Sequence, residues 1–266
     1  MAAGPAAEPP RVGELLRSWR QRRALTQLEL SLVSAISTRH LSFVETGRST
    51  PSREMILHLA EQLDVPLRER NTLLLAGGYA PLYQERRLED AEMEPVRAAV
   101  DRFLRAHEPY PALVVDEHWD IVSANDALDI LTAGVAPELL EPPANALRIA
   151  LHPDGMARST LNFAEWSAHI VHRLRRRALT TGDPRQAELY EELSRYPNVH
   201  LDPVPVGNPS REIVVPLRLR RDEQELAFLT TLATFGTATD VTLANLTIEA
   251  FYPADAQTAN TLLATI

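Results

Sequence analysis

The side chains best suited to contacting another molecule lie between residues 37 and 48 of the 266-residue chain. Arg39 could donate two hydrogen bonds to O6 and N7 of guanine, a pairing that favours the right base by about 1 to 3 kcal/mol. Arg48 could contact a backbone phosphate, which sets position rather than sequence. Positive charge gathers around them, since residues 11–53 contain 8 Arg and 3 Glu although the whole chain has a formal charge of −9. These residue types predict binding to double-stranded DNA.

Residue patterns typical of enzymes are missing from the sequence. The 8 His are scattered without an HExxH or HxH pair, and neither a GxSxG motif nor a glycine-rich phosphate loop occurs. Cys is absent, which excludes disulfides, thiolate catalysis and Cys-ligated zinc and agrees with a reducing cytoplasm. We therefore expect no enzyme, no metal site and no cofactor. An enzyme fused to a DNA-binding domain is the least favoured interpretation.

Five short helices are expected to position the DNA-binding side chains. Thr26 can cap the second helix, with Glu29 three residues later as its partner in a capping box. Ser37 or Thr38 can cap the third helix, and Gly47 ends it. The helices are expected over 12–23, after 26, over 38–46, over 52–64 and over 67–75, with a turn over 34–37. Together they predict a compact all-α domain.

The second and third helices and their turn have the arrangement of a helix-turn-helix, in which the second of the two helices lies in the major groove. The run from LTQ at 25–27 through ETG at 45–47 to PS at 51–52 resembles the Cro and lambda-repressor type, over roughly residues 11–66. That family usually has Gly in the turn, where this chain has Ala35. Ala35 must therefore adopt a left-handed conformation, or the turn must differ.

This resemblance implies roles for residues of the second and third helices. Gln27 is expected to contact phosphate and brace the recognition helix, and Thr38 and Arg39 are expected to meet base edges. The predicted DNA-binding residues are Thr26, Gln27, Ser37, Thr38, Arg39, His40, Ser42, Phe43 and Arg48. A polar helix face can also be merely solvated, and Phe43 could pack into the domain instead of touching thymine methyl groups.

A second domain of α+β class is expected after the helices, which makes the chain multidomain. Residues 1–87 have 12 Arg and 9 acidic residues, a balance of +3, whereas residues 88–266 have 15 Arg and 27 acidic residues, a balance of −12. A hairpin within 111–125 and three apolar runs at 211–221, 224–236 and 241–253 predict an antiparallel sheet. Helices at 126–131, at 159–179 and from 183, with a segment at 144–151, are expected on one face. This is the element order of a PAS-like sensor.

Four separated motifs, in order along nearly the whole chain, resemble the MmyB-like transcription regulators. They are RHLSFVETGRSTPSREM at 39–55, LLLAGGYAP at 73–81, YPALVVDEHWDIVSAN at 110–125 and TFGTATDVTLANLTIEAFYP at 234–253. The resemblance implies a bacterial one-component regulator that binds operator DNA as a homodimer. It also implies that the PAS-like domain holds a small, largely apolar ligand of the fatty-acid kind.

Residues that could line such a pocket come from the inward faces of the strands and from the long helix at 159–179. Polar groups at four positions could orient a carboxylate: Asn125, His152, Asn162 and His169. The predicted ligand-binding residues are Asn125, His152, Asn162, Phe163, Trp166, His169, Ile170, Arg173, Phe228, Thr230, Leu232 and Ile248. An apolar stripe at helical spacing can be plain core, and Asn125 can cap a helix. A domain that mediates only partner binding or dimerisation, without a small ligand, is therefore the alternative.

The expected organisation is a disordered arm over 1–10, a DNA-binding domain over 11–82, a linker over 83–94 and a ligand-binding domain over 95–266. Nothing approaches the run of about eighteen apolar residues that a membrane span needs. The first ten residues lack the charged and apolar regions of a secretory leader. We therefore expect a soluble cytoplasmic protein without a membrane partner.

Overall fold

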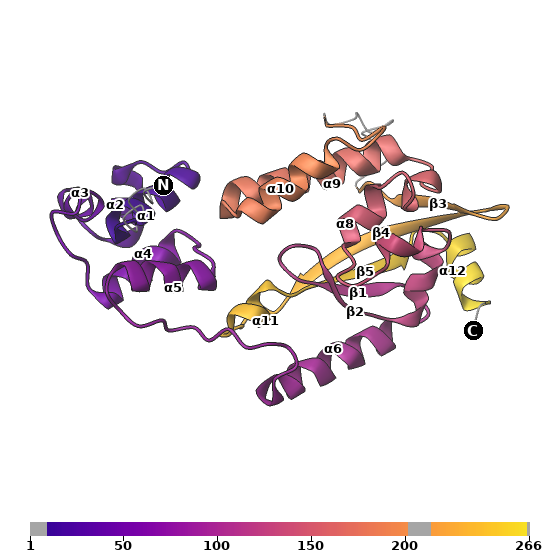
Figure 1. The fold of residues 1–266 in the computed structure, drawn as a ribbon, viewed down its shortest axis with the longest axis horizontal. Coiled ribbons are helices and arrows are strands. Elements are labelled where there is room, and N and C mark those ends of the chain that lie inside the picture. Colours follow the sequence, from indigo (N-terminus) through magenta and orange to yellow (C-terminus); the bar gives the residue numbers. More distant parts are fainter. Residues whose placement is uncertain (1–9, 202–213, 265–266) are drawn as a thin grey trace, which may run out of the picture. The chain divides into compact units, whose positions relative to one another are not determined.

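The computed structural model describes residues 10–201 and 214–264, which divide into two compact units (Figure 1). The first unit contains the described residues up to Glu85 together with Thr239–Val241, and the second contains the others. The arm predicted over 1–10 falls, except for Pro10, outside the described residues, as do positions 211–213 of the strand predicted over 211–221.

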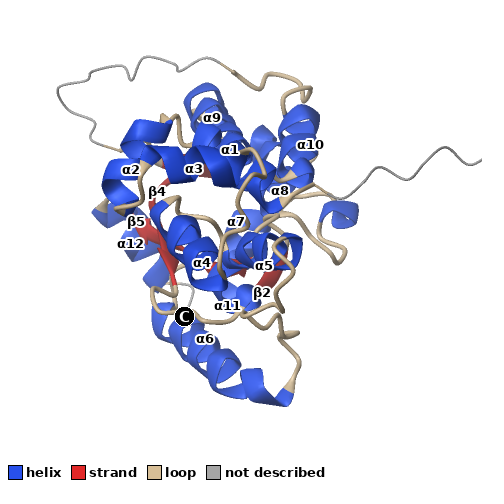
Figure 2. Ribbon diagram, turned by 90° about the vertical axis from the view of Figure 1, so that its left-hand side faces the viewer, coloured by secondary structure: helices blue, strands red, loops and turns tan. Residues whose placement is uncertain are grey.

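The first unit is built from five helices, as the sequence predicts (Figure 2). Their apolar faces pack into one core, in which Trp19, Leu30, Leu41 and Ile56 are almost completely buried. The helices are α1 (Val12–Arg22), α2 (Gln27–Ser34), α3 (Thr38–Glu45), α4 (Arg53–Gln62) and α5 (Leu67–Ala76).

The turn between α2 and α3 shows how a non-glycine residue is accommodated there. Ala35 has φ 54° and ψ 27°, which is the left-handed conformation expected for this position. Ala has a Cβ that makes this conformation costly, so the surrounding packing must maintain it. The capping box predicted at the start of α2 is confirmed, since Thr26 Oγ1 accepts from the Glu29 amide at 3.1 Å and Glu29 Oε2 accepts from the Thr26 amide at 2.6 Å.

Gly13 allows α1 to approach the backbone of α3 closely. A Cβ at this position would overlap the carbonyl oxygen of Val44 and would lie 3.1 Å from the Cα of Glu45. These are backbone atoms, so they cannot move aside as the end of a flexible side chain can. The absence of a side chain at residue 13 therefore helps to set the position of α3.

The second unit is organised around one antiparallel sheet in the order β2-β1-β5-β4-β3. The hairpin predicted within 111–125 is confirmed, because β1 pairs with β2. Central strand β5 pairs with β1 on one side and β4 on the other, which places Leu113 and Leu232 beside Glu249. The strands are β1 (Ala112–Val115), β2 (Ile121–Ala124), β3 (Leu217–Arg221), β4 (Gln224–Thr234) and β5 (Thr247–Pro253).

Helices cover both faces of this sheet, whereas the sequence predicted helices on one face (Figure 1). Val100 and Leu104 of α6 pack on the face that carries Ala112, Val114 and Ile248. The opposite face is covered mainly by α8, α9 and α10. The helices of this unit are α6 (Glu94–His107), α7 (Asp129–Thr132), α8 (Ala146–Leu151), α9 (Phe163–Thr181), α10 (Pro184–Leu193), α11 (Val241–Asn245) and α12 (Ala256–Leu263). Short 3-10 turns lie at Ala91–Met93, Asp126–Leu128, Pro137–Leu139 and Met156–Arg158.

Several predicted element boundaries are corrected by the structure. Residues 241–245 form α11 instead of the start of a strand, so β5 begins at Thr247. The strand predicted from 211 begins at Leu217 in the described part of the chain, and α9 begins at Phe163 instead of residue 159. Helices α6 and α12 were not predicted. For β3 and α9 the type of element was predicted correctly and only its start differs, whereas the type was wrong over 241–245 and α6 and α12 were missed.

Ile248 lies on the opposite face of the sheet from the predicted one. It packs in the cluster with Leu104 and Val114, whereas Glu249 and Phe251 of the same strand face the other layer. All five residues from Thr247 to Phe251 are buried, because β5 is central and covered on both faces. Such a strand lacks the polar and apolar alternation that would show which side chains point inward.

Candidate DNA-binding helix and ligand pocket

The predicted DNA-binding residues gather at the start of α2 and along α3. Arg39 is exposed on α3 and Arg48 is exposed just after its end, while Thr38, His40 and Ser42 are half-buried. Hydroxyl groups at two of the positions already take part in helix capping: Thr26 Oγ1 caps α2, and Ser37 Oγ accepts from the His40 amide at 3.3 Å. Arg39 and Arg48 therefore offer the most accessible charged groups of the predicted set.

Arg39 and Phe43 form one surface on α3. The Arg39 guanidinium carbon lies 5.4 Å from the centre of the Phe43 ring, within cation–π range. Phe43 is half-buried, so its ring stays partly accessible. The Phe43 carbonyl accepts from the Arg48 amide at 2.8 Å, which fixes the backbone where α3 ends. The arrangement presents a planar cation and an aromatic edge, the groups used for guanine and thymine contacts.

Gln27 braces α3, as the sequence predicts, through a buried charge cluster. Its Nε2 donates to Glu45 Oε2 at 2.8 Å. Arg20 on α1 donates to both oxygens of the same carboxylate, from Nε at 2.6 Å and from Nη2 at 2.9 Å, and its Nη1 donates to the Leu25 carbonyl at 2.7 Å. Burial opposes ionisation of Glu45, but the hydrogen bonds from Arg20 and Gln27 and the charge of Arg20 lower its pKa. The hydrogen-bonded pair of Arg20 and Glu45, which we call the closed pair, joins α1 to α3, and Gln27 joins α2 to it.

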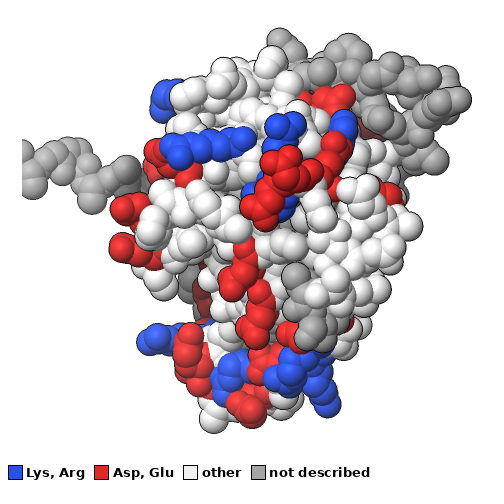
Figure 3. All heavy atoms as spheres, turned by 90° about the vertical axis from the view of Figure 1, so that its right-hand side faces the viewer, with Lys and Arg blue, Asp and Glu red and all other residues white. Residues whose placement is uncertain are grey.

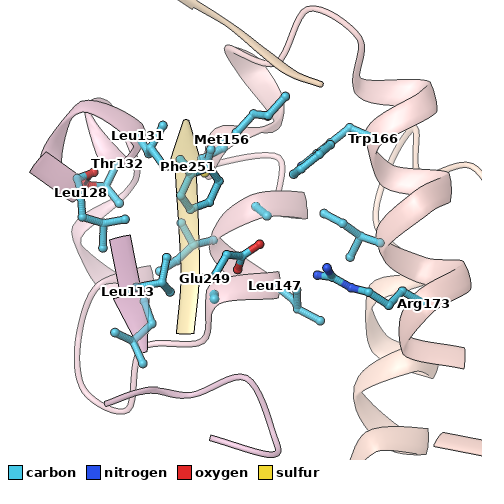
Figure 4. Close-up of a pocket in the computed structure, with 16 residues that line it drawn as sticks. Leu113, Leu128, Leu131, Thr132, Leu147, Met156, Trp166, Arg173, Glu249 and Phe251 are labelled. Carbon is cyan, nitrogen blue, oxygen red and sulfur yellow. Dashed lines mark hydrogen bonds between the residues drawn. The ribbon is translucent and has the colours of Figure 1, made fainter. Parts of the chain in front are cut away.

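A pocket lies within the second unit, between the sheet and the helices that cover it (Figure 4). Its walls are apolar apart from Thr132, Arg173 and Glu249. The free space amounts to about 50 Å³, which is room for a few water molecules. A typical small-molecule site is several times larger, so a ligand with a long chain requires neighbouring side chains to move.

Two charged side chains face each other across this pocket. Arg173 points in from α9 and Glu249 from β5, with their charged ends directed toward one another (Figure 4). The Glu249 residue is 6% exposed, and no hydrogen bond from its side chain occurs among the described residues. Burial raises the pKa of Glu249, although the charge of Arg173 opposes this shift. The carboxyl group therefore carries its proton more readily than an exposed one.

Arg173 is also incompletely paired. Its Nε is buried and has no hydrogen-bond partner among the described residues. The guanidinium carbon lies 4.6 Å from the centre of the Trp119 ring, which supports the cation from one side. Burial lowers the pKa of Arg173, and the charge of Glu249 partly restores it. An anion placed beside Arg173 would supply the missing hydrogen-bond acceptor.

Three of the predicted ligand-binding residues, Trp166, Ile170 and Arg173, line this pocket. Phe228 does not line it, but is completely buried beside it and contacts the pocket residue Phe251 edge-on, with ring centres 6.4 Å apart. Phe163 packs half-buried at the edge of the same core. The long helix thus brings together the aromatic, aliphatic and cationic side chains expected of it.

Other predicted ligand-binding residues on β4, β5 and α9 lie away from the pocket. Thr230 is half-buried, and its Oγ1 has no hydrogen-bond partner in the described part of the chain. Leu232 is 42% exposed, and Ile248 faces α6 on the other side of the sheet. His169 is exposed on the side of α9 where Arg176 and Thr180 line a separate hollow. Partial loss of hydration where the ring packs on α9, together with the neighbouring Arg173 and His172, lowers the pKa of His169.

The remaining polar candidates make hydrogen bonds that hold loops in place. Asn125 accepts from the Ala112 amide at 2.9 Å and donates to the Tyr110 carbonyl at 2.8 Å. Asn162 donates to the Pro216 carbonyl at 2.8 Å and accepts from the Arg218 amide at 3.1 Å. His152 Nδ1 is 3.0 Å from the Asp154 amide, which donates to it. None of these three residues lines the pocket.

Comparison with protein families matches almost the whole second unit. Residues 96–264 match the MmyB-like transcription regulator ligand binding domain, and residues 16–70 match a helix-turn-helix family. The chain is a member of the MmyB-like transcription regulators. A search of curated proteins found no significant relative.

Membership in this family establishes the two partners in general terms. The MmyB-like regulator binds DNA through its helix-turn-helix and binds a ligand through its second domain, and both matching families are regulatory instead of catalytic. Among the described residues, no group of three or more His, Asp or Glu side chains could hold a metal ion, and no helix is long and apolar enough to cross a membrane.

Acidic and basic side chains are mixed on one face of the regulator, whereas α3 and the residues after it carry exposed basic side chains. On the face drawn in Figure 3, acidic side chains lie between groups of basic ones, and its described residues form no continuous basic field. The exposed Arg39 and Arg48, in contrast, have no acidic residue between them in the sequence except the buried Glu45. Since DNA affinity depends on cations near phosphates, this arrangement favours α3 as the contact.

Sequence reasoning missed two charged residues that the structure makes prominent. Arg20 was counted only as local positive charge, although it completes the pair with Glu45. Glu249 was left out because it is the one charged residue in the apolar stretch TIEAFY at 247–252. An acidic residue in the middle of an otherwise buried strand was itself a signal, since such groups are rarely buried without a purpose.

Proposed function

We propose that this regulator senses a carboxylic acid with an apolar chain, such as a fatty acid, in the pocket of its second unit. The observation that supports this proposal is the Arg173 side chain at the wall of an apolar pocket, since its buried Nε has no hydrogen-bond partner among the residues that the structure describes. The carboxylate of the ligand would accept hydrogen bonds from Arg173, and the chain would lie against Trp166 and Ile170.

Ligand entry must widen the pocket, because about 50 Å³ holds no more than a small part of an acyl chain. Met156 and Leu147 line the pocket, and Met in particular has three rotatable bonds that let it change shape at low cost. The ligand would therefore favour an expanded arrangement of the domain. A ligand can change DNA affinity only by such a preference for one of two states.

Operator recognition is assigned to α3 in this proposal. Arg39, Thr38 and Phe43 would read base edges, while Arg48, Ser42 and His40 would contact the backbone or neighbouring bases. Binding as a cytoplasmic homodimer would place two copies of α3 about one DNA turn apart on a two-fold operator. Residues 11–82 and 95–266 would provide the DNA-binding and ligand-binding activities.

Native mass spectrometry of the purified full chain, followed by solvent extraction, tests this proposal. We expect a retained species whose extracted mass is that of an acyl-chain acid, and we expect it to be lost from an Arg173→Met variant. DNA affinity is then measured with and without added acid. A domain that retains no acid and binds none when fatty acids of several lengths are added would contradict the proposal and favour a partner-binding role.

A further inference from the structure

The nearest neighbours of Glu249 in the sheet offer its carboxyl no hydrogen bond. Its neighbours in register are Leu113 on β1 and Leu232 on β4, both aliphatic. Across the pocket it faces Arg173 of α9. The ion pairs of the described residues, which are nitrogen–oxygen contacts within 4.0 Å, do not include one between Arg173 and Glu249. The Glu249 residue is 6% exposed, its carboxyl is directed into the pocket, and no hydrogen bond joins this carboxyl to another described residue (Figure 4).

The charges in the pocket decide what can lie between these two side chains. The described residues that line it come from β1, β2, β3, β5, α7, α8, α9 and two adjoining turns, and only Arg173 and Glu249 among them titrate. If a ligand carboxylate entered beside an ionised Glu249, two negative charges would share one guanidinium in an apolar site. Two carboxyl groups in such a site cannot both ionise readily, so one of them retains a proton.

We propose that Glu249 is protonated when the acid is bound and donates a hydrogen bond to the ligand carboxylate that Arg173 holds. This inference rests on the proposed function and adds a second residue that selects the ligand. The ligand carboxylate accepts from the Arg173 guanidinium and from the Glu249 hydroxyl, so that both charged side chains of the pocket gain a hydrogen-bond partner. The proton comes from solvent, and the complex therefore contains one more proton than an arrangement with two carboxylates.

This arrangement makes binding dependent on pH. Below the pKa that Glu249 has in the free protein, the proton is already present and affinity stays constant. Above that pKa, each acid binds together with a proton, so affinity falls by up to about tenfold for each pH unit. Burial raises the pKa of Glu249 and so favours the protonated form, while the charge of Arg173 opposes it. The anionic head group shifts the balance further toward the protonated form.

Carbon NMR of the full chain with ¹³C-labelled Glu side-chain carboxyls, titrated with decanoate, tests the inference. The Glu249 signal is assigned by its loss in Glu249→Gln, in which an amide supplies a fixed neutral donor. We expect the Glu249 signal of the decanoate complex to remain at the position of a protonated carboxyl at pH 7. Calorimetry in buffers with different ionisation enthalpies then counts the protons taken up, and Glu249→Gln should bind decanoate without uptake at any pH.

Glu223→Gln is the matched control, since Glu223 is exposed in the turn between β3 and β4. It should show the same decanoate affinity and the same pH dependence as the unchanged protein. A Glu249 signal at the ionised position in the complex at pH 7 would overturn the inference while leaving the proposed function intact. Failure of decanoate and shorter and longer acids to bind at any pH would overturn both.

Discussion

Each unit contains a buried Glu that faces an Arg, and the two pairs differ in whether hydrogen bonds join the partners. In the first unit, Arg20 and Glu45 meet through hydrogen bonds of 2.6 and 2.9 Å, and Gln27 adds a third. In the second unit, Arg173 and Glu249 face each other across a pocket without such a bond. Arg and Glu therefore join helices in the first unit, whereas in the second unit their polar groups remain available to a ligand.

This difference has opposite effects on the two acids. Hydrogen bonds from Arg20 and Gln27 overcome the effect of burial and lower the pKa of Glu45, whereas burial raises the pKa of Glu249. A buried ion pair that lacks hydrogen bonds is expensive to maintain, so an incomplete pair beside a cavity indicates a ligand site better than a structural one. Both Glu45 and Glu249 are buried, so burial alone does not show whether a buried Glu is structural or binds a ligand. The hydrogen-bond partners of its carboxyl group distinguish the two roles.

The largest effect is expected when the closed pair of the first unit is broken. Arg20→Met leaves Glu45 buried with Gln27 as its remaining donor, and we expect a loss of about 3 to 5 kcal/mol in the stability of this unit. Hydrogen exchange of α1 and α3, followed by mass spectrometry, measures the loss. Arg17→Met, at an exposed position on the same helix, should change protection little. Unchanged protection in Arg20→Met would show that the closed pair is not structural.

Close packing of α1 against α3 is expected to matter almost as much. Gly13→Ala forces the backbone of Val44 or α1 to move, which should destabilise the first unit by about 1 to 3 kcal/mol. Gly236→Ala in the second unit is the matched control, because nothing lies within 4 Å of a Cβ there. Denaturant unfolding followed by circular dichroism compares the two variants. Equal midpoints would contradict the importance of the Gly13 contact.

Variants of Arg39 and Arg48 should distinguish contacts to base edges from contacts to backbone phosphates. With an operator selected from random DNA, Arg39→Ala should weaken binding by about 1 to 3 kcal/mol and relax preference at one base pair. Arg48→Ala should weaken binding to all sequences and lower the dependence of log affinity on log salt concentration by about 1. Fluorescence anisotropy over a salt series measures both. A loss of preference in Arg48→Ala but not in Arg39→Ala would reverse the assigned roles.

Ionisation of Glu249, which faces Arg173, is expected to have a smaller effect on the free energy of unfolding of the ligand-free protein. The effect is of order 1 kcal/mol for each unit by which folding changes the pKa of Glu249. Because burial raises the pKa of Glu249 from 4.5, its stabilising contribution is complete below that value and is lost as pH rises through the pKa of the folded state. Glu249→Gln should lack this loss, so that it gains stability over the unchanged protein as pH rises above 4.5. Unfolding curves between pH 5 and 8 test this, and parallel pH profiles would contradict it.

Local sequence signals predicted the helices of the first unit and the capping box at Thr26. The brace from Gln27 to Glu45 and the left-handed conformation considered for Ala35 were expected from the family resemblance, and both are present. The second unit depends on contacts between distant segments. The central strand β5 has no alternation because both of its faces are buried, so the sequence did not show that Glu249 and not Ile248 faces the pocket.

The part of the ligand pocket that one helix carries was predicted from the spacing of its residues. Trp166, Ile170 and Arg173 lie one helical turn or so apart on α9, and their spacing identified them. Met156, Leu217 and Phe251 come from elements far apart in the sequence, and they meet only when the sheet and helices assemble. Asn125, His152 and Asn162 have residue types suited to a ligand, but their hydrogen bonds hold loops.

The central claim is that the complete pair is structural and the incomplete pair binds an acid, and a crossed comparison of Arg20→Met with Arg173→Met tests it most directly. Decanoate affinity and unfolding of each unit are measured for both variants of the full chain. We expect Arg173→Met to lose about ten- to a hundredfold in decanoate affinity without destabilising the first unit, as befits a lost hydrogen bond to a charge. Arg20→Met should destabilise the first unit and keep its decanoate affinity. Equal decanoate affinity in Arg173→Met and the unchanged protein would contradict the account.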